Sequence, residues 1–286
     1  MRPAAPDTGS IRNLPDISLM RFALILCLLA PLGAQNSRPA RTLWKGHSGE
    51  FTIDWSTGNL QVFRAGDAHP VLDLREAAAA DWKQISKDSD YRSLTSSYAY
   101  RLLSVVGPVL SIEEEDYCDC GGAHPIAGKM FRAIDLNRSS AAKPVAAKLT
   151  DLFSAPAISA ALREDRVVKS VLPPGAPPQS LDALLNAVNS KSAAVGECSY
   201  FFPDDLLQHF AIYDLKADRA AVRVSLSHAV EICRGSMIQL GLWLPVPDRL
   251  WPPLKAAKSG SDGLLMVNHK SGEDDVTRFE FSLARK

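Results

Sequence analysis

The sequence predicts an α+β fold of mixed and antiparallel sheets, with a helical segment in the middle of the chain and disulfide bonds that hold the structure together. Segments in which apolar and polar residues alternate lie on both sides of a stretch with helical periodicity at 145–171. Two cysteines come shortly before that stretch and two follow it. Hydrophobic residues make up 46% of the 286 positions and charged residues 22%, so the chain can bury a sizeable core.

The charge balance excludes one large class of partners. Lys and Arg together number 32, and Asp and Glu together also number 32, so the formal net charge is zero. No stretch interleaves basic residues with stacking aromatics, as a protein that binds single-stranded nucleic acid would. The chain also lacks a phosphate-binding loop and a dinucleotide fingerprint. We therefore expect no nucleic-acid partner and no cofactor.

The N-terminal region has the pattern of a secretory signal peptide. Arg21 precedes an apolar run at 22–32, and Leu32-Gly33-Ala34 offers a cleavage site before Gln35. The run is shorter than the roughly 20 residues that span a bilayer. We expect residues 1–34 to be an N-terminal extension and a cleaved signal peptide, with Met20 as an alternative translation start. The mature protein is then periplasmic or secreted and has no transmembrane segment.

Export determines how the cysteines are interpreted. Of the five cysteines, Cys27 lies in the signal peptide, which leaves Cys118, Cys120, Cys198 and Cys233. Cysteines in an oxidising compartment usually form disulfide bonds. A bridge between Cys118 and Cys120 would close a very tight ring, so we expect both to pair over long range with Cys198 and Cys233.

The region 35–96 is predicted to hold a β-hairpin and a helix. Residues 51–55 and 60–63 alternate apolar and polar side chains around a turn at 56–59. Residues 72–85 contain four consecutive alanines and are predicted to be helical.

The region 97–258 is predicted to be the main domain, followed by a C-terminal strand extension at 259–286. Strands are expected at 98–106, 109–112 and 129–136, with helices at 145–171 and 180–189 separated by a proline-rich connector at 173–178. Further strands are expected at 210–215, 221–226, 237–245 and 276–283, with a short helical turn at 250–255.

A nine-residue loop at 117–125 concentrates the residue types that carry chemistry. It follows an acidic run and reads Tyr117-Cys118-Asp119-Cys120-Gly121-Gly122-Ala123-His124-Pro125. Thiolates and imidazole suit zinc, but the cysteine spacing is unusual for zinc and export favours disulfides, so we assign no metal site. The same argument disfavours a cysteine nucleophile, and we assign no catalytic residue.

The acidic run at 113–116 is a candidate source of acid–base catalysis. A period of two places Glu113 and Glu115 on one face of a strand and Glu114 and Asp116 on the other. Without a visible pocket, the simpler interpretation is a solvated strand end. His209 and His228 lie near strand ends and are interpreted as structural.

Several segments in a fixed order resemble a known family. They are Tyr100-Arg-Leu-Leu-Ser-Val, Gly121-Gly-Ala-His124-Pro125, Asp135-Leu136, Leu149-Thr-Asp-Leu-Phe153 and Phe210-Ala-Ile-Tyr213. Residues 97–258 resemble the DUF3298 family, an exported domain of lysozyme-sensing anti-sigma factors that often has a DUF4163 companion. The resemblance implies an α+β domain that binds rather than catalyses. The chain carries no sigma-binding segment, so sigma-factor control is not implied.

The resulting hypothesis is an exported soluble binding domain of the cell envelope. Its expected partners are lysozyme-type muramidases or peptidoglycan. The residues expected to bind are Glu115, Tyr117, Asp119, Gly121, Gly122, Ala123, His124 and Pro125. The alternative is an envelope enzyme that acts on peptidoglycan or another glycan through His124 and a nearby carboxylate, either Asp119 or Glu115. A purely structural envelope protein is a third hypothesis.

Overall fold

The computed structural model describes residues 39–88, 93–120, 124–175, 177–189, 191–227, 233, 235–269 and 272–284. Contacts divide the chain into Met1–Pro39 and Ala40–Lys286, and every element described below belongs to the second unit. The predicted signal peptide at 1–34 and the predicted structural residue His228 lie outside the described residues.

The N-terminal sheet contains four antiparallel strands in the order β1-β2-β3-β4. Their bounds are β1 Thr42–Ser48, β2 Phe51–Ser56, β3 Leu60–Arg64 and β4 Pro70–Asp73. The predicted hairpin is β2–β3, and its turn is held by the Ser56 hydroxyl, which accepts from the backbone N–H groups of Gly58 and Asn59. Alternate residues of β2 are buried, as the sequence pattern indicates.

Helix α1 (Leu74–Asp88) follows β4 directly and matches the helix predicted at 72–85. The Asp73 carboxylate accepts hydrogen bonds from the backbone N–H groups of Arg75 (2.9 Å) and Glu76 (3.1 Å), which caps the first turn. The alanines at 77–80 then favour helix propagation; Ala78 is buried and Ala77 half-buried, whereas Ala79 and Ala80 are exposed.

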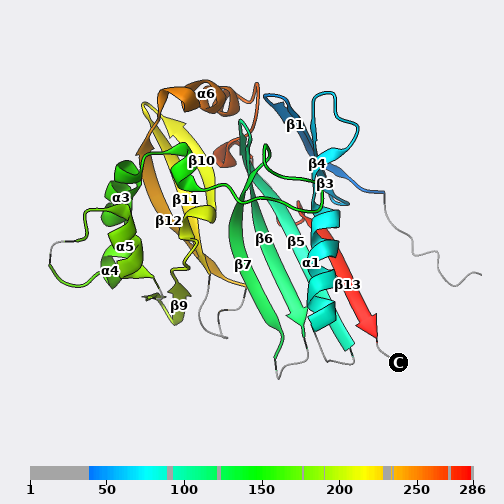
Figure 1. The fold of residues 1–286 in the computed structure, drawn as a ribbon, viewed down its shortest axis with the longest axis horizontal. Helices are drawn as coiled ribbons and strands as arrows, with labels where there is room; N and C mark the ends of the chain where they lie inside the picture. The colour runs from blue at the N-terminus through cyan, green and yellow to red at the C-terminus, as the bar shows by residue number, and fades with distance from the viewer. Residues whose placement is uncertain are drawn as a thin grey trace, which may run out of the picture. The chain divides into compact units, whose positions relative to one another are not determined.

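The central sheet contains four antiparallel strands in the order β13-β5-β6-β7 (Figure 1). Their bounds are β5 Ser93–Val106, β6 Val109–Asp119, β7 Ile126–Asp135 and β13 Thr277–Ala284. A turn at Gly107-Pro108 joins β5 to β6, and Gly107 adopts a positive φ of 56° there. Residue 97, where the main domain is predicted to begin, lies inside β5. The predicted C-terminal extension supplies β13 to the same sheet.

The two faces of the central sheet have different neighbours. One face, here called the α1 face, carries the even-numbered residues of β6. It contacts α1: the hydroxyl of Tyr98, in β5, donates to Asp81, in α1, at 2.7 Å. The other, the β10 face, carries Leu103 and Phe131, which pack on Ala211 of β10.

The third sheet is also antiparallel and has the order β10-β11-β12. Its strands are β10 Phe210–Lys216, β11 Arg219–Ser227 and β12 Met237–Pro245. Two hydrogen bonds connect it to the central sheet: Phe131 N–H donates to the Ser225 hydroxyl at 2.8 Å, and Ile212 N–H donates to the Ser104 hydroxyl at 3.2 Å. These bonds pin β10 and β11 against the β10 face.

Short helices cover the side of the third sheet that faces away from the central sheet (Figure 1). The elements between β7 and β10 are α2 Leu149–Leu152, α3 Ala155–Glu164, α4 Arg166–Val171, α5 Leu181–Val188, β8 Ser192–Val195, β9 Cys198–Phe201 and η1 Leu206–Gln208. After β12 come η3 Asp248–Leu250, α6 Trp251–Ser259 and η4 Met266–Asn268. The expected helical stretch at 145–171 is thus three helices, interrupted where Phe153 and Asp165 adopt extended backbone conformations.

Two large hydrophobic cores result from this arrangement. The first joins the third sheet to the helices that cover it, and the second joins the N-terminal sheet, α1 and the central sheet. Trp55 and Phe279 belong to the second core, and the indole N–H of Trp55 donates to the Thr277 hydroxyl at 3.1 Å. The α+β class is confirmed, with sheets as the larger part, and every strand pairing among the described residues is antiparallel.

Cys118, Cys120, Cys198 and Cys233 all form disulfide bonds, but the expected connectivity is wrong. Cys118 pairs with Cys120, and Cys198 pairs with Cys233. The Cα atoms lie 5.2 Å apart in the first pair and 5.8 Å in the second, both within the range that a disulfide spans. The tight ring can close because β6 ends at Asp119, so the backbone contracts from the roughly 6.7 Å that an extended strand sets between alternate residues.

Candidate functional site

The predicted binding loop lies at the free end of the β6–β7 pair, here called the β6–β7 tip (residues 115–120 and 124–127). Tyr117 and Asp119 belong to β6, His124 is exposed, and Pro125 is half-buried. Gly121, Gly122 and Ala123 lie outside the described residues. The sequence expectation that this segment leaves a strand is confirmed, although the strand extends further into it than expected.

The tip exposes large apolar side chains on both faces of the sheet. Tyr117 is 41% exposed and Ile126 is 62% exposed. Tyr117 is uncovered because its cross-strand neighbours, Ser97 and Ala127, are small. Glu115, Tyr117 and Asp119 follow one another along the β10 face at intervals of about 7 Å, and all three are exposed.

The Cys118–Cys120 bridge fastens the end of β6. Cys118 is buried and paired with Ile126 in the ladder, whereas Cys120 lies just beyond the last strand residue. The bond therefore ties the first residue after the strand to a buried ladder position. This fixes the direction in which the chain leaves β6.

A polar pocket of about 340 Å³ adjoins the tip on the β10 face. Inside it, Glu113 pairs with Arg101 (2.8 Å) and with Lys129 (3.3 Å), while Glu115 reaches Lys129 at 3.7 Å. The lining residues are Ala99, Arg101, Glu113, Glu115, Lys129, Glu273, Val276 and Arg278. Two cations compensate Glu113, so Glu115, whose side chain is half-exposed, is the carboxylate that this pocket offers to solvent.

The four acidic residues divide between the two faces as the period of two predicts. Glu113 and Glu115 lie on the β10 face, and Glu114 and Asp116 lie on the α1 face. The interpretation as a solvated strand end is wrong for Glu114, which is only 5% exposed. Helix α1 contacts the sheet on this face, and Glu114 lies in a pocket between the two.

Glu114 belongs to a polar group that the sequence did not reveal, here called the Arg132 cluster. Its members come from α1, β5, β6 and β7 and are Asp81, Tyr98, Tyr100, Glu114, Asp116 and Arg132. The Arg132 Nε forms an ion pair with Glu114 Oε2. The Asp116 carboxylate lies across Gly128, where a β-carbon would collide with it, so Gly128 makes room for this acid.

Burial dominates the electrostatics of the Arg132 cluster. It raises the pKa of Glu114 from 4.5 to about 7, and the attraction of Arg132 only partly offsets this effect, while Asp116 and Asp81 add to it. Burial likewise raises the pKa values of Asp116, Tyr98 and Tyr100 above their usual range. Glu114 thus exchanges its proton near neutral pH, which is typical of functional carboxylates as well as of buried ion pairs.

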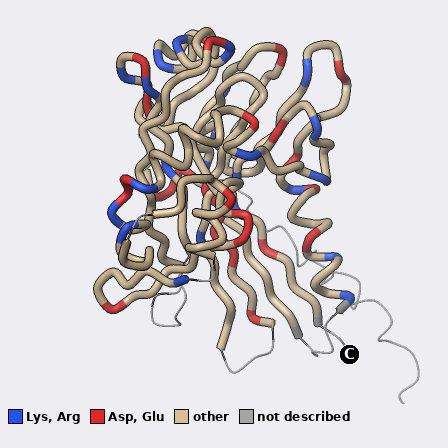
Figure 2. Tube along the Cα trace, turned by 60° about the vertical axis from the view of Figure 1, so that its left-hand side comes forward, with Lys and Arg blue, Asp and Glu red and all other residues tan. Residues whose placement is uncertain are grey.

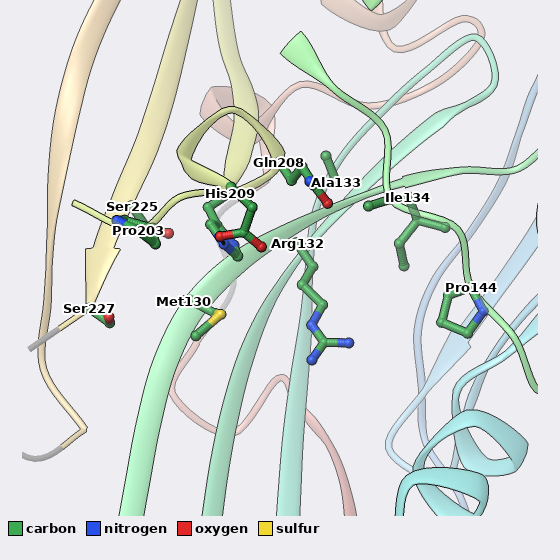
Figure 3. Close-up of a pocket in the computed structure, with 12 residues that line it drawn as sticks. Met130, Arg132, Ala133, Ile134, Pro144, Pro203, Gln208, His209, Ser225 and Ser227 are labelled. Atoms are coloured by element: carbon green, nitrogen blue, oxygen red, sulfur yellow. Dashed lines mark hydrogen bonds and ion pairs between the residues drawn. The ribbon is translucent and has the colours of Figure 1, made fainter. Parts of the chain in front are cut away.

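Two pockets meet at Arg132. The larger, of about 370 Å³, lies between β7 and the η1 segment, and the smaller, of about 230 Å³, lies between α1 and the central sheet. Both are lined by Arg132, Ile134 and Pro144. Figure 3 shows the Arg132 side chain extending from β7 into the space between His209 and Pro144.

His209 lines the larger pocket but has no nitrogen available for catalysis. Its Nε2 lies 2.9 Å from Asp205 Oδ1, and its Nδ1 lies 3.0 Å from the backbone oxygen of Phe131. Both partners are acceptors, so the ring fastens the η1 segment to β7. The interpretation of His209 as structural agrees with these contacts.

The described residues contain no group of three or more His, Cys, Asp or Glu side chains arranged to hold a metal ion. Among the helices of the described ranges, none is long and apolar enough to cross a membrane. His124 lines none of the three pockets described above.

Comparison with known proteins gives no match to a family model and no match to a curated protein. The resemblance of residues 97–258 to the DUF3298 family therefore stays a prediction from its motifs.

Proposed function

We propose that the protein is an exported binding protein of the cell envelope that recognises a basic, lysozyme-type muramidase through the β6–β7 tip. One observation carries this proposal: the tip exposes Tyr117 and Ile126 on opposite faces, beside a disulfide that fixes the end of β6. Exposed aromatic and aliphatic side chains on a restrained segment are the features from which protein–protein interfaces gain most of their free energy.

The disulfide bonds support export. Two bonds, Cys118–Cys120 and Cys198–Cys233, account for every cysteine after Cys27. Such bonds persist mainly in oxidising compartments, which include the periplasm and the extracellular space.

The charges near the tip support a basic partner. Glu115 and Asp119 lie on either side of Tyr117 on the same face, and both are exposed. Figure 2 shows that basic and acidic segments are interspersed along the rest of the trace, so the attraction would be local to the tip. Complementary charges raise association rates and fix the orientation of a partner.

The enzyme alternative has weaker support. Acid–base catalysis needs its groups held around a substrate and shielded from bulk water. His124 and Asp119 are both exposed and line none of the three pockets described above, while Glu115 lines a pocket without His124.

Binding of the mature chain to hen-type lysozyme, measured by calorimetry or biolayer interferometry, tests the proposal. We expect binding at micromolar concentration or tighter, and we expect Tyr117→Ala to weaken it by about tenfold or more. His124→Ala, on the same tip, should also weaken it.

Phe201→Ala is the matched control, because Phe201 is 45% exposed and also lies near a disulfide, on β9. Its affinity should equal that of the unaltered protein. Absence of lysozyme binding at micromolar concentration would remove this version of the proposal, and retention by insoluble peptidoglycan in the same experiment would indicate the cell wall instead.

A further inference from the structure

We propose that the pockets that meet at Arg132 form a binding site for a small zwitterion, a molecule that carries a carboxylate and an amino group a few bonds apart, as a free amino acid does. This site is separate from the β6–β7 tip and does not depend on the function proposed for it. The argument rests on the groups that face the two pockets and on their size.

Arg132 offers the binding group for a carboxylate. Only its Nε is engaged, by Glu114, and its two terminal nitrogens make no hydrogen bond or ion pair with any residue that the structure describes. The side chain is 52% exposed and extends into the space between the pockets (Figure 3). A guanidinium with a free pair of N–H groups binds a carboxylate in bidentate fashion.

The opposite wall of the smaller pocket offers binding groups for an amine. Asp81 projects from α1, across the pocket from the strands that carry Glu114 and Arg132. The Asp81 carboxylate accepts one hydrogen bond, from Tyr98, which leaves further lone pairs for an ammonium group. The cationic and acidic groups thus lie on different walls of one small space.

A third group is the hydroxyl of Tyr100, a residue that lines the smaller pocket. Tyr100 is 5% exposed, and its hydroxyl makes no hydrogen bond to a described residue. The hydroxyl is not among the fully buried polar atoms that lack a partner, so it is accessible from the pocket and available to a bound molecule. It can donate to a carboxylate or accept from an amine.

The apolar walls and the volume limit the size of the molecule. Ala77 and Ala78 face the pocket from α1, and because their side chains are small, space remains between the helix and the sheet. Ile112 and Ile134 form the floor. A volume of about 230 Å³ is below the range of pockets for drug-sized ligands and suits a molecule with a short apolar side chain.

The mixture of charges selects against ions of one sign. A simple anion at Arg132 would lie close to Glu114 and face Asp81, whereas a simple cation at Asp81 would face Arg132. A zwitterion satisfies both walls at once. The larger pocket, of about 370 Å³, opens on the other side of Arg132 and can hold a longer substituent on the carboxylate side.

Titration of the full mature chain with alanine, acetate and methylamine, followed by calorimetry or by NMR chemical shifts, tests this inference. We expect alanine to bind at least tenfold more tightly than either singly charged probe. Arg132→Gln should weaken alanine binding at least tenfold. Tyr100→Phe, which removes only a hydroxyl, should weaken it by a few-fold.

Arg138→Gln is the matched control, because Arg138 is also 52% exposed but pairs with Asp135 outside both pockets. Its alanine affinity should be unchanged. Arg132→Gln removes the ionic partner of buried Glu114, so circular dichroism must show that this variant folds. If it does not fold, Tyr100→Phe provides the test. The inference is overturned if alanine does not bind at about 10 mM, if acetate binds equally well, or if the folded variants bind as the unaltered protein does.

Discussion

Glu114 has acidic neighbours on both sides in the sequence, yet it alone of the four consecutive acids at 113–116 is fully buried. Glu113 and Glu115, one position away, point to the β10 face, where Lys129 contacts both of them. Glu114 points to the α1 face and receives Arg132 as its ionic partner. The burial and the ionic partner of each acid therefore depend on which elements pack against its face of the sheet. The local sequence does not reveal these elements.

The raised pKa of Glu114 predicts a pH-dependent stability. With a pKa of about 7 in the folded protein against 4.5 as its ordinary value, the native state holds a proton that the unfolded chain has released. The free energy of unfolding should therefore fall as pH rises from 4.5 to about 7, by up to about 3 kcal/mol. Burial raises this pKa most. Of the charged groups that face Glu114, Arg132 and His209 lower its pKa, and Asp116 and Asp81 raise it.

Denaturant unfolding at pH 5 and pH 8 measures this effect. Glu114→Gln should be less sensitive to pH than the unaltered protein over this interval, because the amide does not titrate. Equal pH dependence in the two proteins would show that Glu114 does not hold a proton in the folded state. Asp116, whose pKa is also raised by burial, leaves some dependence of the same sign in the variant.

Gly263 illustrates a position where only glycine fits. It has a φ of 90°, its N–H donates to the His47 carbonyl at 2.6 Å, and a β-carbon there would collide with the Val105 carbonyl. We expect Gly263→Ala to destabilise the protein by about 3 kcal/mol, measured by thermal or chemical unfolding. Gly260 has a similar φ of 74° but open space around it, so Gly260→Ala should cost only about 1 kcal/mol. Similar losses at both positions would contradict this account.

At the scale of elements, the two disulfides should differ in their effect on stability. Cys198–Cys233 closes a loop across a sequence separation of 35, whereas Cys118–Cys120 spans a separation of 2. Loop-closure entropy predicts a loss of about 4 kcal/mol when Cys198 and Cys233 are both changed to Ser, and of less than about 2 kcal/mol for the same change at Cys118 and Cys120.

Chemical denaturation of the two double variants measures the difference. If the Cys118/Cys120 variant is the less stable one, the bridge at the tip supports more of the fold than its small loop implies. If lysozyme binding is established, the same variant should bind more weakly while it remains folded, because the end of β6 loses its restraint.

Most strands could be predicted from the sequence because their alternation is local. The hairpin β2–β3 and the strands β5, β10, β11, β12 and β13 agree with the expected segments. β6 is longer than the alternating segment at 109–112 that predicts it, and the acidic run that follows has low intrinsic strand propensity. It continues to Asp119 because β5 and β7 pair with it on both sides and supply Arg101, Lys129 and Arg132 to the acids.

Other elements were missed because their signal is weak or interrupted. β1 has no clear alternating pattern, and it forms by pairing with β2. The short strands β8 and β9 carry too few alternating residues to be recognised. The expected helix at 145–171 breaks at Phe153 and Asp165, and Asp165 instead caps α4 by accepting from Val167 N–H at 2.8 Å.

At the scale of the whole molecule, the two candidate sites differ in how far they could be predicted. The β6–β7 tip is contiguous in sequence, so its unusual residues could be identified together. The Arg132 cluster combines α1 with three strands of the central sheet, and its members meet only when the helix packs across the sheet. Arg132 and Glu114 are not direct partners in the ladder, since Arg132 pairs with Ile112 and Glu114 with Met130.

The shared core predicts that residues 97–258 do not fold alone. The second core requires Trp55 and Ile53 from the N-terminal sheet and Phe279 from β13. We expect a fragment of residues 97–258 to lack cooperative thermal unfolding in circular dichroism, whereas residues 40–286 should unfold cooperatively. Cooperative unfolding of the shorter fragment would show that the segment resembling the DUF3298 family is an independent domain.

The pairing of β13 with β5 has a consequence for the order of folding. Arg278 lies opposite Ala99 in the ladder, so this edge of β5 gains its partner only after the residues of β13 have left the ribosome. Until then β5 presents open backbone donors and acceptors that can pair with another nascent chain. Such long-range pairing also slows folding. A chain interrupted before residue 277 therefore cannot complete the central sheet and should be a target for chaperones and proteases.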